Sequence, residues 1–192
     1  MSSQVSSTPR QGLNARQAGT VEKLLAAGDE ELRTVGHEAL TVRTVASRAG
    51  VSPATAYTYL ASRNHLFAEL FHRHLVTEPG PEPTGETATA RIQSVTRHLA
   101  GQLAESPELA AAATIALLGT DPEVERLRLV IGTEFVNRFR DAIGEPADPR
   151  VLETLALAFS GALLQAGMGV MTYTEMGERL DGVVAVIMKG HE

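Results

Sequence analysis

The stretch 50-GVSPATAYTYLASRNHL-66 carries the strongest structural signal in this chain. Ser52 is followed by Pro53, and a serine N-cap with proline at the first helical position is a frequent start of an α-helix. Successive residues of a helix are about 100° apart, so Ala56 and Leu60 point toward the same side. We therefore expect a short helix that buries this side in the protein core.

The other sides of this helix carry a different chemistry. Ala54, Thr55 and Thr58 point away from the core, and Tyr57 and Tyr59 project to the two flanks. A tyrosine hydroxyl donates a hydrogen bond to phosphate without adding charge. The pattern fits a helix in a DNA groove, with its rings at the bordering phosphate strands. An ordinary helical hairpin inside a core is the alternative, and such a hairpin favours Leu or Met at those flanks.

The residues before Ser52 complete a helix-turn-helix. Thr41 fits an N-cap, and a short helix with one apolar face precedes Gly50. Two short helices joined by a glycine-containing turn form this motif, whose second helix normally enters the major groove of DNA. Helix N-termini at Thr41 and Ser52 favour anions. Arg43 and Arg63 fall in first turns, although either arginine alone could equally be solvated surface.

The rest of the chain predicts an all-α fold of about nine helices. Apolar residues recur at helical spacing on both sides of the linker 77-TEPGPEPTGET-87. Four helices are expected before it, the first with Val21 to Val35 on its apolar face and an end at Gly36, the fourth from Ser62. The five expected after it, three of them with Ser-Pro or Asp-Pro starts, cover 87–104, 106–118, 121–143, 148–172 and 174–189.

Composition and charge narrow the class of protein. The 192 residues include 43% hydrophobic residues and no cysteine, which excludes disulfides and thiolate metal sites and favours a reducing cytoplasm. The net charge of −6 is uneven, because residues 1–76 carry +2 and residues 77–192 carry −8. We expect a disordered polar arm over 1–13, a helix-turn-helix domain over 14–76 and a helical domain over 77–192.

The segment 154–174 holds no charged residue and is long enough to cross a bilayer. It contains Ser160 and Gln165, and no Lys or Arg cluster flanks it, so a buried helix is the preferred interpretation. Small side chains recur every fourth residue in it, which lets another helix approach closely.

Residues 38-EALTVRTVASRAGVSPATAYTYLASRNHLFAEL-70 resemble the DNA-binding region of the TetR family of bacterial transcriptional regulators. The shared features are a threonine N-cap, the run A-x-x-A-G-V-S, a tyrosine-rich recognition helix and a Ser-Lys-like start of the fourth helix. The resemblance implies a homodimer, usually a repressor, whose C-terminal domain binds a small molecule and releases DNA. Leu60 departs from a frequent aromatic residue, and Thr58 from a frequent basic or bulky polar one.

The resemblance also implies site residues. The expected contacts to the DNA backbone are Thr41, Arg43, Ser52, Tyr57, Tyr59 and Arg63, and the expected base-facing residues are Ala54, Thr55 and Thr58. The reading face has no Arg, Asn or Gln, so thymine-methyl contacts or shape readout are expected instead of bidentate base contacts.

The resemblance further implies that the last two helices form a four-helix bundle across a dimer axis. The candidate interface residues are Ala158, Ala162, Ala166, Val183, Val186 and Ile187. The same stripe could alternatively be buried within one subunit. An apolar or weakly polar effector is expected in a cavity lined from Val95, His98, Leu99, Leu103, Leu118, Phe135, Asn137, Phe139 and Gln165, each of which could also be plain core or surface.

The sequence offers no enzyme or metal constellation. The spacings of His65, His72 and His74 do not form a chelate, and no nucleophile–base pair or phosphate-binding glycine loop is present. We expect no cofactor and no catalysis. The resulting hypothesis is a DNA-binding repressor released from a palindromic operator by an apolar ligand. The alternatives are a helix-turn-helix protein without an effector, and an all-helical enzyme or carrier.

Overall fold

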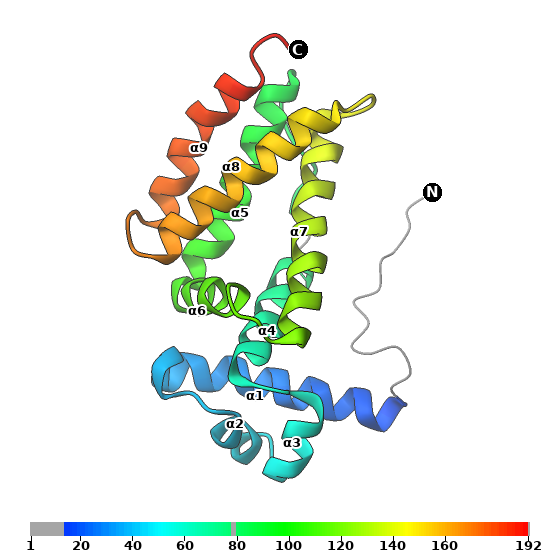
Figure 1. The fold of residues 1–192 in the computed structure, drawn as a ribbon, viewed down its shortest axis with the longest axis vertical. Coiled ribbons are helices and arrows are strands. Elements are labelled where there is room, and N and C mark those ends of the chain that lie inside the picture. Colours follow the sequence, from blue (N-terminus) through cyan, green and yellow to red (C-terminus); the bar gives the residue numbers. More distant parts are fainter. Residues whose placement is uncertain (1–13, 78–79, 192) are drawn as a thin grey trace.

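The computed structural model describes residues 14–77 and 80–191, and over these ranges the predicted all-α fold is confirmed (Figure 1). The predicted disordered arm, residues 1–13, lies outside the described ranges. Within them the chain forms nine helices. Their bounds are α1 Ala15–Ala39, α2 Val42–Arg48, α3 Pro53–Tyr59, α4 Arg63–Thr77, α5 Ala88–Glu105, α6 Pro107–Leu117, α7 Pro122–Ile143, α8 Pro149–Gly167 and α9 Tyr173–Ile187.

The apolar side chains form two cores, which we call the head core and the body core. The head core joins α1, α2, α3 and one face of α4, and the body core joins α5, α7, α8 and α9. Helix α4 serves both, because Leu66 and Leu70 lie in the head core whereas Phe71 and Leu75 lie in the body core. The two halves of the molecule are therefore connected through one continuous helix (Figure 1).

Helix α6 reinforces this connection. It lies across the junction between the two halves (Figure 1), and its faces are divided between the cores. Leu109, Ala112 and Ala116 pack into the head core, and Ala110 and Ala113 pack into the body core. Because closely packed interiors transmit displacement, a shift of α6 or α4 in the body would displace the helices of the head that pack against them.

The head is held by close packing and by ion pairs between its helices. Helix α4 crosses α1 at Gly28, where a Cβ atom would lie 3.0 Å from Leu66 Cδ1. Arg48 of α2 donates to Glu31 of α1 across 2.6 Å, and Glu31 is a buried residue. A charge buried in this way is stable only with its partner, so the pair ties α2 to α1.

The body core is built around aromatic contacts. The ring of Phe159 on α8 lies 4.8 Å from that of Phe135 and 5.7 Å from that of Phe139, both on α7. Tilted and edge-to-face pairs at these centroid distances are favourable. They hold α7 against α8, beside α5 and α9.

Two helix ends differ from the sequence-based prediction. The first helix was expected to end at Gly36, and the backbone there does leave the helical conformation, with φ 75° and ψ 170°, but helical turns resume as far as Ala39. Val35, expected on the buried face, is 42% exposed because it lies just before this break. The eighth helix was expected to reach residue 172 but ends at Gly167.

The uncharged segment 154–174 is thus not one helix. It is divided by the turn that precedes the N-cap Thr172 of α9. Across the ranges that the structure describes, no helix combines the length and the apolar character needed to cross a bilayer.

Leu24, fully buried in the head core, tests this packing. Leu24→Ala is expected to lower the free energy of unfolding by about 2–5 kcal/mol, because it removes buried methyl groups and leaves a cavity. The neighbouring Lys23→Ala, at an exposed position, is expected to change it by less than about 0.5 kcal/mol. Denaturant unfolding at one fixed protein concentration measures both variants, and equal losses would contradict the assigned core.

Candidate DNA-binding surface

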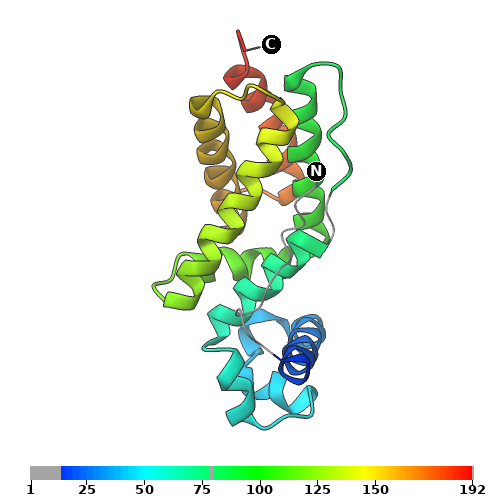
Figure 2. The same ribbon diagram turned by 90° about the vertical axis from the view of Figure 1, so that its right-hand side faces the viewer.

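Helices α2 and α3 lie at the end of the molecule remote from the C-terminus (Figures 1 and 2). The turn between them depends on Gly50, whose φ of 67° is readily adopted only by glycine. The Val51 amide donates to the Ala46 carbonyl at 3.0 Å and closes the turn. The sequence-predicted helix-turn-helix is therefore formed, with α3 as its second helix.

The rotation of α3 about its axis is fixed by the head core. Ala56 and Leu60 are 0% and 1% exposed, so the side of α3 that bears them is buried. Ala54 and Thr58 are exposed on the opposite side, and Thr55 is partly exposed. The residues predicted to face DNA bases therefore share one accessible face.

The hydroxyl groups on this face are engaged within the helix. Ser52 Oγ accepts from the Thr55 amide at 3.1 Å and lies 2.9 Å from Thr55 Oγ1. Thr58 Oγ1 donates to the Ala54 carbonyl at 3.0 Å. With these hydroxyls engaged inside the helix, the face can offer DNA the methyl groups of Ala54, Thr55 and Thr58. An apolar face of this kind suits thymine methyl groups better than hydrogen-bonding base edges.

The two tyrosines are placed differently. Tyr57 is 48% exposed, as expected for a ring at the flank of the reading face. Tyr59 is half-buried and packs against the head core. Tyr57 is thus the better placed of the two to reach a phosphate, and Tyr59 also contributes to packing.

The predicted phosphate contacts at the helix starts lie on the same end of the molecule. Thr41 closes a capping box, since its Oγ1 accepts from the Thr44 amide and Thr44 Oγ1 accepts from the Thr41 amide, each at 3.1 Å. Arg43 is exposed in the first turn of α2. Arg63, also exposed, donates to the Glu38 carbonyl at 3.2 Å and lies 5.9 Å above the Phe67 ring. This anchoring lowers the entropy that Arg63 would lose on binding an anion.

Sequence reasoning missed the contact that fastens the α3–α4 turn to the body. Ser62 Oγ accepts from the His65 amide at 2.9 Å and donates to Asp121 Oδ2 at 2.6 Å. Asp121 is also the N-cap of α7, where its Oδ1 accepts from the Glu123 amide at 3.0 Å. The hydrogen bond from Ser62 is the main reason why the pKa of Asp121 lies below its ordinary value.

A second connection runs through His65, a buried residue near the start of α4. Its Nδ1 accepts from the Ala61 amide at 3.1 Å, and its Nε2 lies 3.2 Å from Glu69 Oε1. Glu69 in turn lies 3.5 Å from Arg126 of α7. Together, the Ser62 and His65 contacts link the end of the reading helix to the start of α7.

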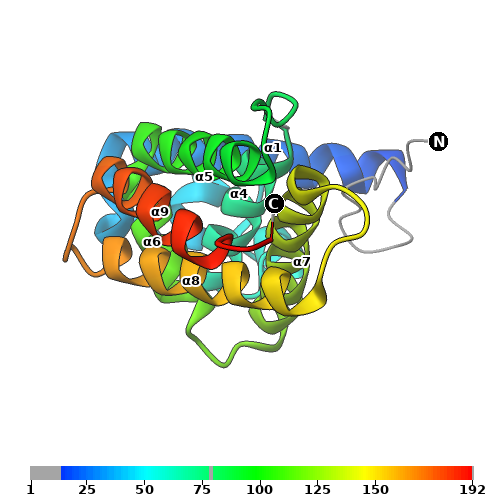
Figure 3. The same ribbon diagram turned by 90° about the horizontal axis from the view of Figure 1, so that it is seen from above.

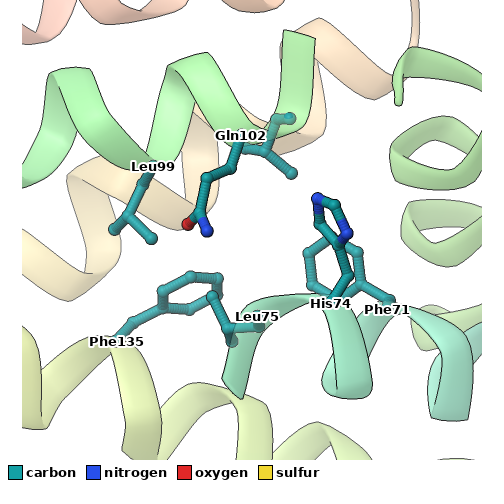
Figure 4. A pocket seen from close by; sticks show the side chains of 7 residues that line it. Phe71, His74, Leu75, Leu99, Gln102 and Phe135 are labelled. Carbon is teal, nitrogen blue, oxygen red and sulfur yellow. The ribbon is translucent and has the colours of Figure 1, made fainter. Parts of the chain in front are cut away.

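A small cavity lies where α4, α5 and α7 meet in the body (Figure 4). It is lined by Phe71, His74, Leu75, Leu99, Gln102, Leu103 and Phe135. His74 and Gln102 reach toward it from facing helices (Figure 4), and His74 Nε2 is buried without a hydrogen-bond partner in the described chain. Its volume is about 10 Å³, roughly the space of one water molecule.

The structure brings only some of the predicted ligand residues to this cavity. Leu99, Leu103 and Phe135 line it. Val95 and Phe139 are buried in the body core, and Asn137 accepts a hydrogen bond from Arg140 at 2.7 Å. The remaining three lie outside the lining: partly buried His98, and the solvent-facing Leu118 and Gln165. Leu118 was misplaced because it follows the last turn of α6 and is 67% exposed.

The proposed dimer residues divide between the subunit core and its surface. Helices α8 and α9 lie side by side along one flank of the body (Figure 3). Ala166 is buried, and Ala162 and Ile187 pack partly against the body core. Ala158 is half-buried, Val183 is 40% exposed and Val186 is 76% exposed. The part of the stripe left open to a partner is therefore mainly on α9.

Comparisons with known proteins agree with this geometry. Residues 24–70 match the family of bacterial regulatory proteins described as the tetR family. A helix-turn-helix transcriptional regulator of Mycobacterium tuberculosis is 46% identical over 179 residues, covering 92% of this chain and 84% of that one.

Two solved structures share the fold. A TetR transcriptional regulator from Rhodococcus sp. RHA1 superposes with a TM-score of 0.72 at 18% identity, over 90% of this chain and 97% of that one. FadR of Thermus thermophilus, a TetR-family repressor in complex with lauroyl-CoA, gives 0.63 at 19% identity, over 88% and 93%.

The Ser62–Asp121 bond predicts a pH dependence of stability. Because the pKa of Asp121 is lowered in the folded state, the bond stabilises the fold above the unfolded pKa of about 3.9, and this contribution is lost as pH falls through the folded pKa. Asp121→Asn keeps an N-cap side chain but does not titrate. Unfolding measured at pH 7 and pH 3 should therefore show a smaller acid-induced loss in Asp121→Asn than in the wild type.

The matched control is Asp148→Asn, which makes the same change at the N-cap of α8. It is expected to retain more of the wild-type acid loss than Asp121→Asn does. Equal acid losses in the wild type and Asp121→Asn would show that the serine contact does not stabilise the fold.

Proposed function

The chain belongs to the TetR family of bacterial regulatory proteins, and from that premise we propose that it is a repressor released from a palindromic operator by a small, largely apolar ligand. Membership of this family identifies the chain as a transcriptional regulator with a helix-turn-helix DNA-binding domain. The repressor role, the symmetry of the operator and the class of ligand are what we propose. In this proposal the protein acts in the cytoplasm, where the chromosome lies.

The observation that carries the proposal is the outward face of α3. Burial of Ala56 and Leu60 turns the face with Ala54, Thr55 and Thr58 to solvent, beside the exposed ring of Tyr57. A methyl-bearing face between hydroxyl and guanidinium donors matches a groove floor between two phosphate strands. Ser52, Thr41, Arg43, Arg63 and the Tyr59 hydroxyl would supply further backbone contacts.

We assign DNA binding to residues 14–76, and ligand binding and dimerisation to residues 77–192. The exposed α9 residues Val183 and Val186, next to α8, support a dimer interface on this flank of the body. A two-fold axis there places one copy of α3 on each half of a symmetric operator, so half-site spacing reports the dimer geometry.

The cavity supports an apolar effector. Five of its seven lining residues are Leu or Phe, and His74 and Gln102 provide polar anchors. FadR of Thermus thermophilus, which has a similar fold, has been solved in complex with lauroyl-CoA, and this supports the proposal of an apolar effector. A ligand that fits only a widened cavity displaces α4, and it weakens DNA binding in proportion to its preference for that state.

A second candidate is a helix-turn-helix regulator without an effector. The cavity volume of about 10 Å³ favours it, because a site for a drug-sized ligand usually encloses roughly 300 Å³ or more. The two candidates differ in one observable property, the release of bound DNA when an apolar ligand is added.

Substitutions at the reading head test the DNA-binding proposal. Tyr57→Phe and Arg63→Ala are expected to weaken binding to all duplex sequences, with Arg63→Ala lowering the slope of log K against log salt by about 0.9. Thr55→Ser removes the γ-methyl group from the reading face and keeps the hydroxyl beside Ser52, so it should change which sequence is preferred. Fluorescence anisotropy at several salt concentrations measures these effects.

The matched control for charge is Arg150→Ala, at a 90% exposed side chain on α8. It is expected to leave DNA affinity unchanged. The assignment of the head fails if Tyr57→Phe and Arg63→Ala bind DNA as tightly as the wild type.

Val186→Asp tests the dimer interface. A carboxylate buried at a subunit interface is unfavourable, so this variant should be a folded monomer with weakened operator binding. Ala104→Asp places the same charge at an exposed position of α5 and should remain a dimer. Light scattering gives the mass of each variant, and a dimeric Val186→Asp protein would rule out this part of α9 as the interface.

A further inference from the structure

The hydrogen bonds of His65, a buried residue behind the DNA-binding surface, define which of its ring nitrogens carries a proton. It is 2% exposed, and both ring nitrogens lie within hydrogen-bond distance of a partner. A backbone amide can only donate, so the contact with Ala61 requires an unprotonated Nδ1. The ring proton of the neutral imidazole then lies on Nε2, directed at Glu69 Oε1.

The partner of Nδ1 lies in the segment that sets the direction of α3. Only Leu60, Ala61 and Ser62 separate α3 from α4. In a capping box, the third residue of a helix accepts from the N-cap amide. His65 accepts instead from Ala61, one residue before the capping Ser62, and so extends the bracing into the turn itself.

We propose that His65 is a positioning residue for DNA binding, whose neutral imidazole holds the α3–α4 turn and thereby the orientation of the reading helix. The inference rests on the proposed DNA-binding function. His65 acts through Ala61 and contacts no base or phosphate. Leu60 fixes the rotation of α3 by burial, and the His65 bond fixes the angle at which α3 leaves α4.

Charged groups on two elements face the imidazole. The acidic groups are Glu69 of α4 and Asp121 of α7, and the basic group is Arg126 of α7. Protonation places a hydrogen on Nδ1, toward which the Ala61 amide already points, so the bond is lost.

Two amide variants separate the two sides of the ring. The side-chain oxygen of His65→Asn can take the place of Nδ1 and accept from Ala61, whereas the longer amide of His65→Gln reaches the place of Nε2 and Glu69. The affinity for a duplex that the wild type binds is measured by anisotropy at pH 8, with unfolding temperatures recorded in parallel.

At pH 8 we expect His65→Asn to bind within about twofold of the wild type, and His65→Gln about three- to tenfold more weakly, the range that one net hydrogen bond supplies. A purely structural role would lower the unfolding temperature of both variants without separating their DNA affinities.

Equal affinities of the two variants overturn the inference while leaving DNA binding by the wild type intact. A wild type that binds no duplex at low salt removes the proposed function together with the inference. Nitrogen-15 NMR of the wild-type imidazole needs no variant: a ring protonated on Nε2 at pH 8 is expected, and a ring protonated on Nδ1 contradicts the proposal.

Discussion

Burial of Ala56 and Leu60 in the head core determines which face of α3 this protein presents to solvent. A seven-residue helix has little stability of its own, so tertiary packing must hold it. These two contacts fix the rotation of α3, and that rotation determines which side chains meet solvent. Because of this rotation, Ala54, Thr55 and Thr58 share one accessible face, the ring of Tyr57 is exposed, and Tyr59 packs partly against the head core.

The rest of the architecture connects this helix to a distant body. Helix α4 begins at the turn braced by His65, and its later residues Phe71 and Leu75 line the cavity. One continuous helix therefore contacts both the turn and the cavity. Ser62 and Asp121 join the same turn directly to α7. A body that changes shape around a ligand would therefore move the reading helices of a dimer, without any contact between ligand and DNA.

The sequence predicted the helices well because their starts have local causes. Ser52-Pro53, Asp121-Pro122 and Asp148-Pro149 each begin a helix at the expected place. The sites were harder to predict, because they depend on which element faces which. In the sequence, Phe71 and Leu75 indicate an apolar face of α4, but they do not indicate that this face packs on the body. Likewise, no local pattern reveals that Ser62 meets Asp121, 59 residues away. In the same way, no local pattern reveals that Leu118 is exposed after the last turn of α6.

Selection of bound fragments from random or genomic duplex DNA tests whether α3 binds each half of a symmetric site, since the recovered sequences report the reading face and the dimer together. We expect a palindrome whose half-sites are spaced by about one helical turn or a multiple of it, with thymines where the face of Ala54 and Thr55 would lie. No enrichment at low salt, or enrichment of a single asymmetric site, would contradict it.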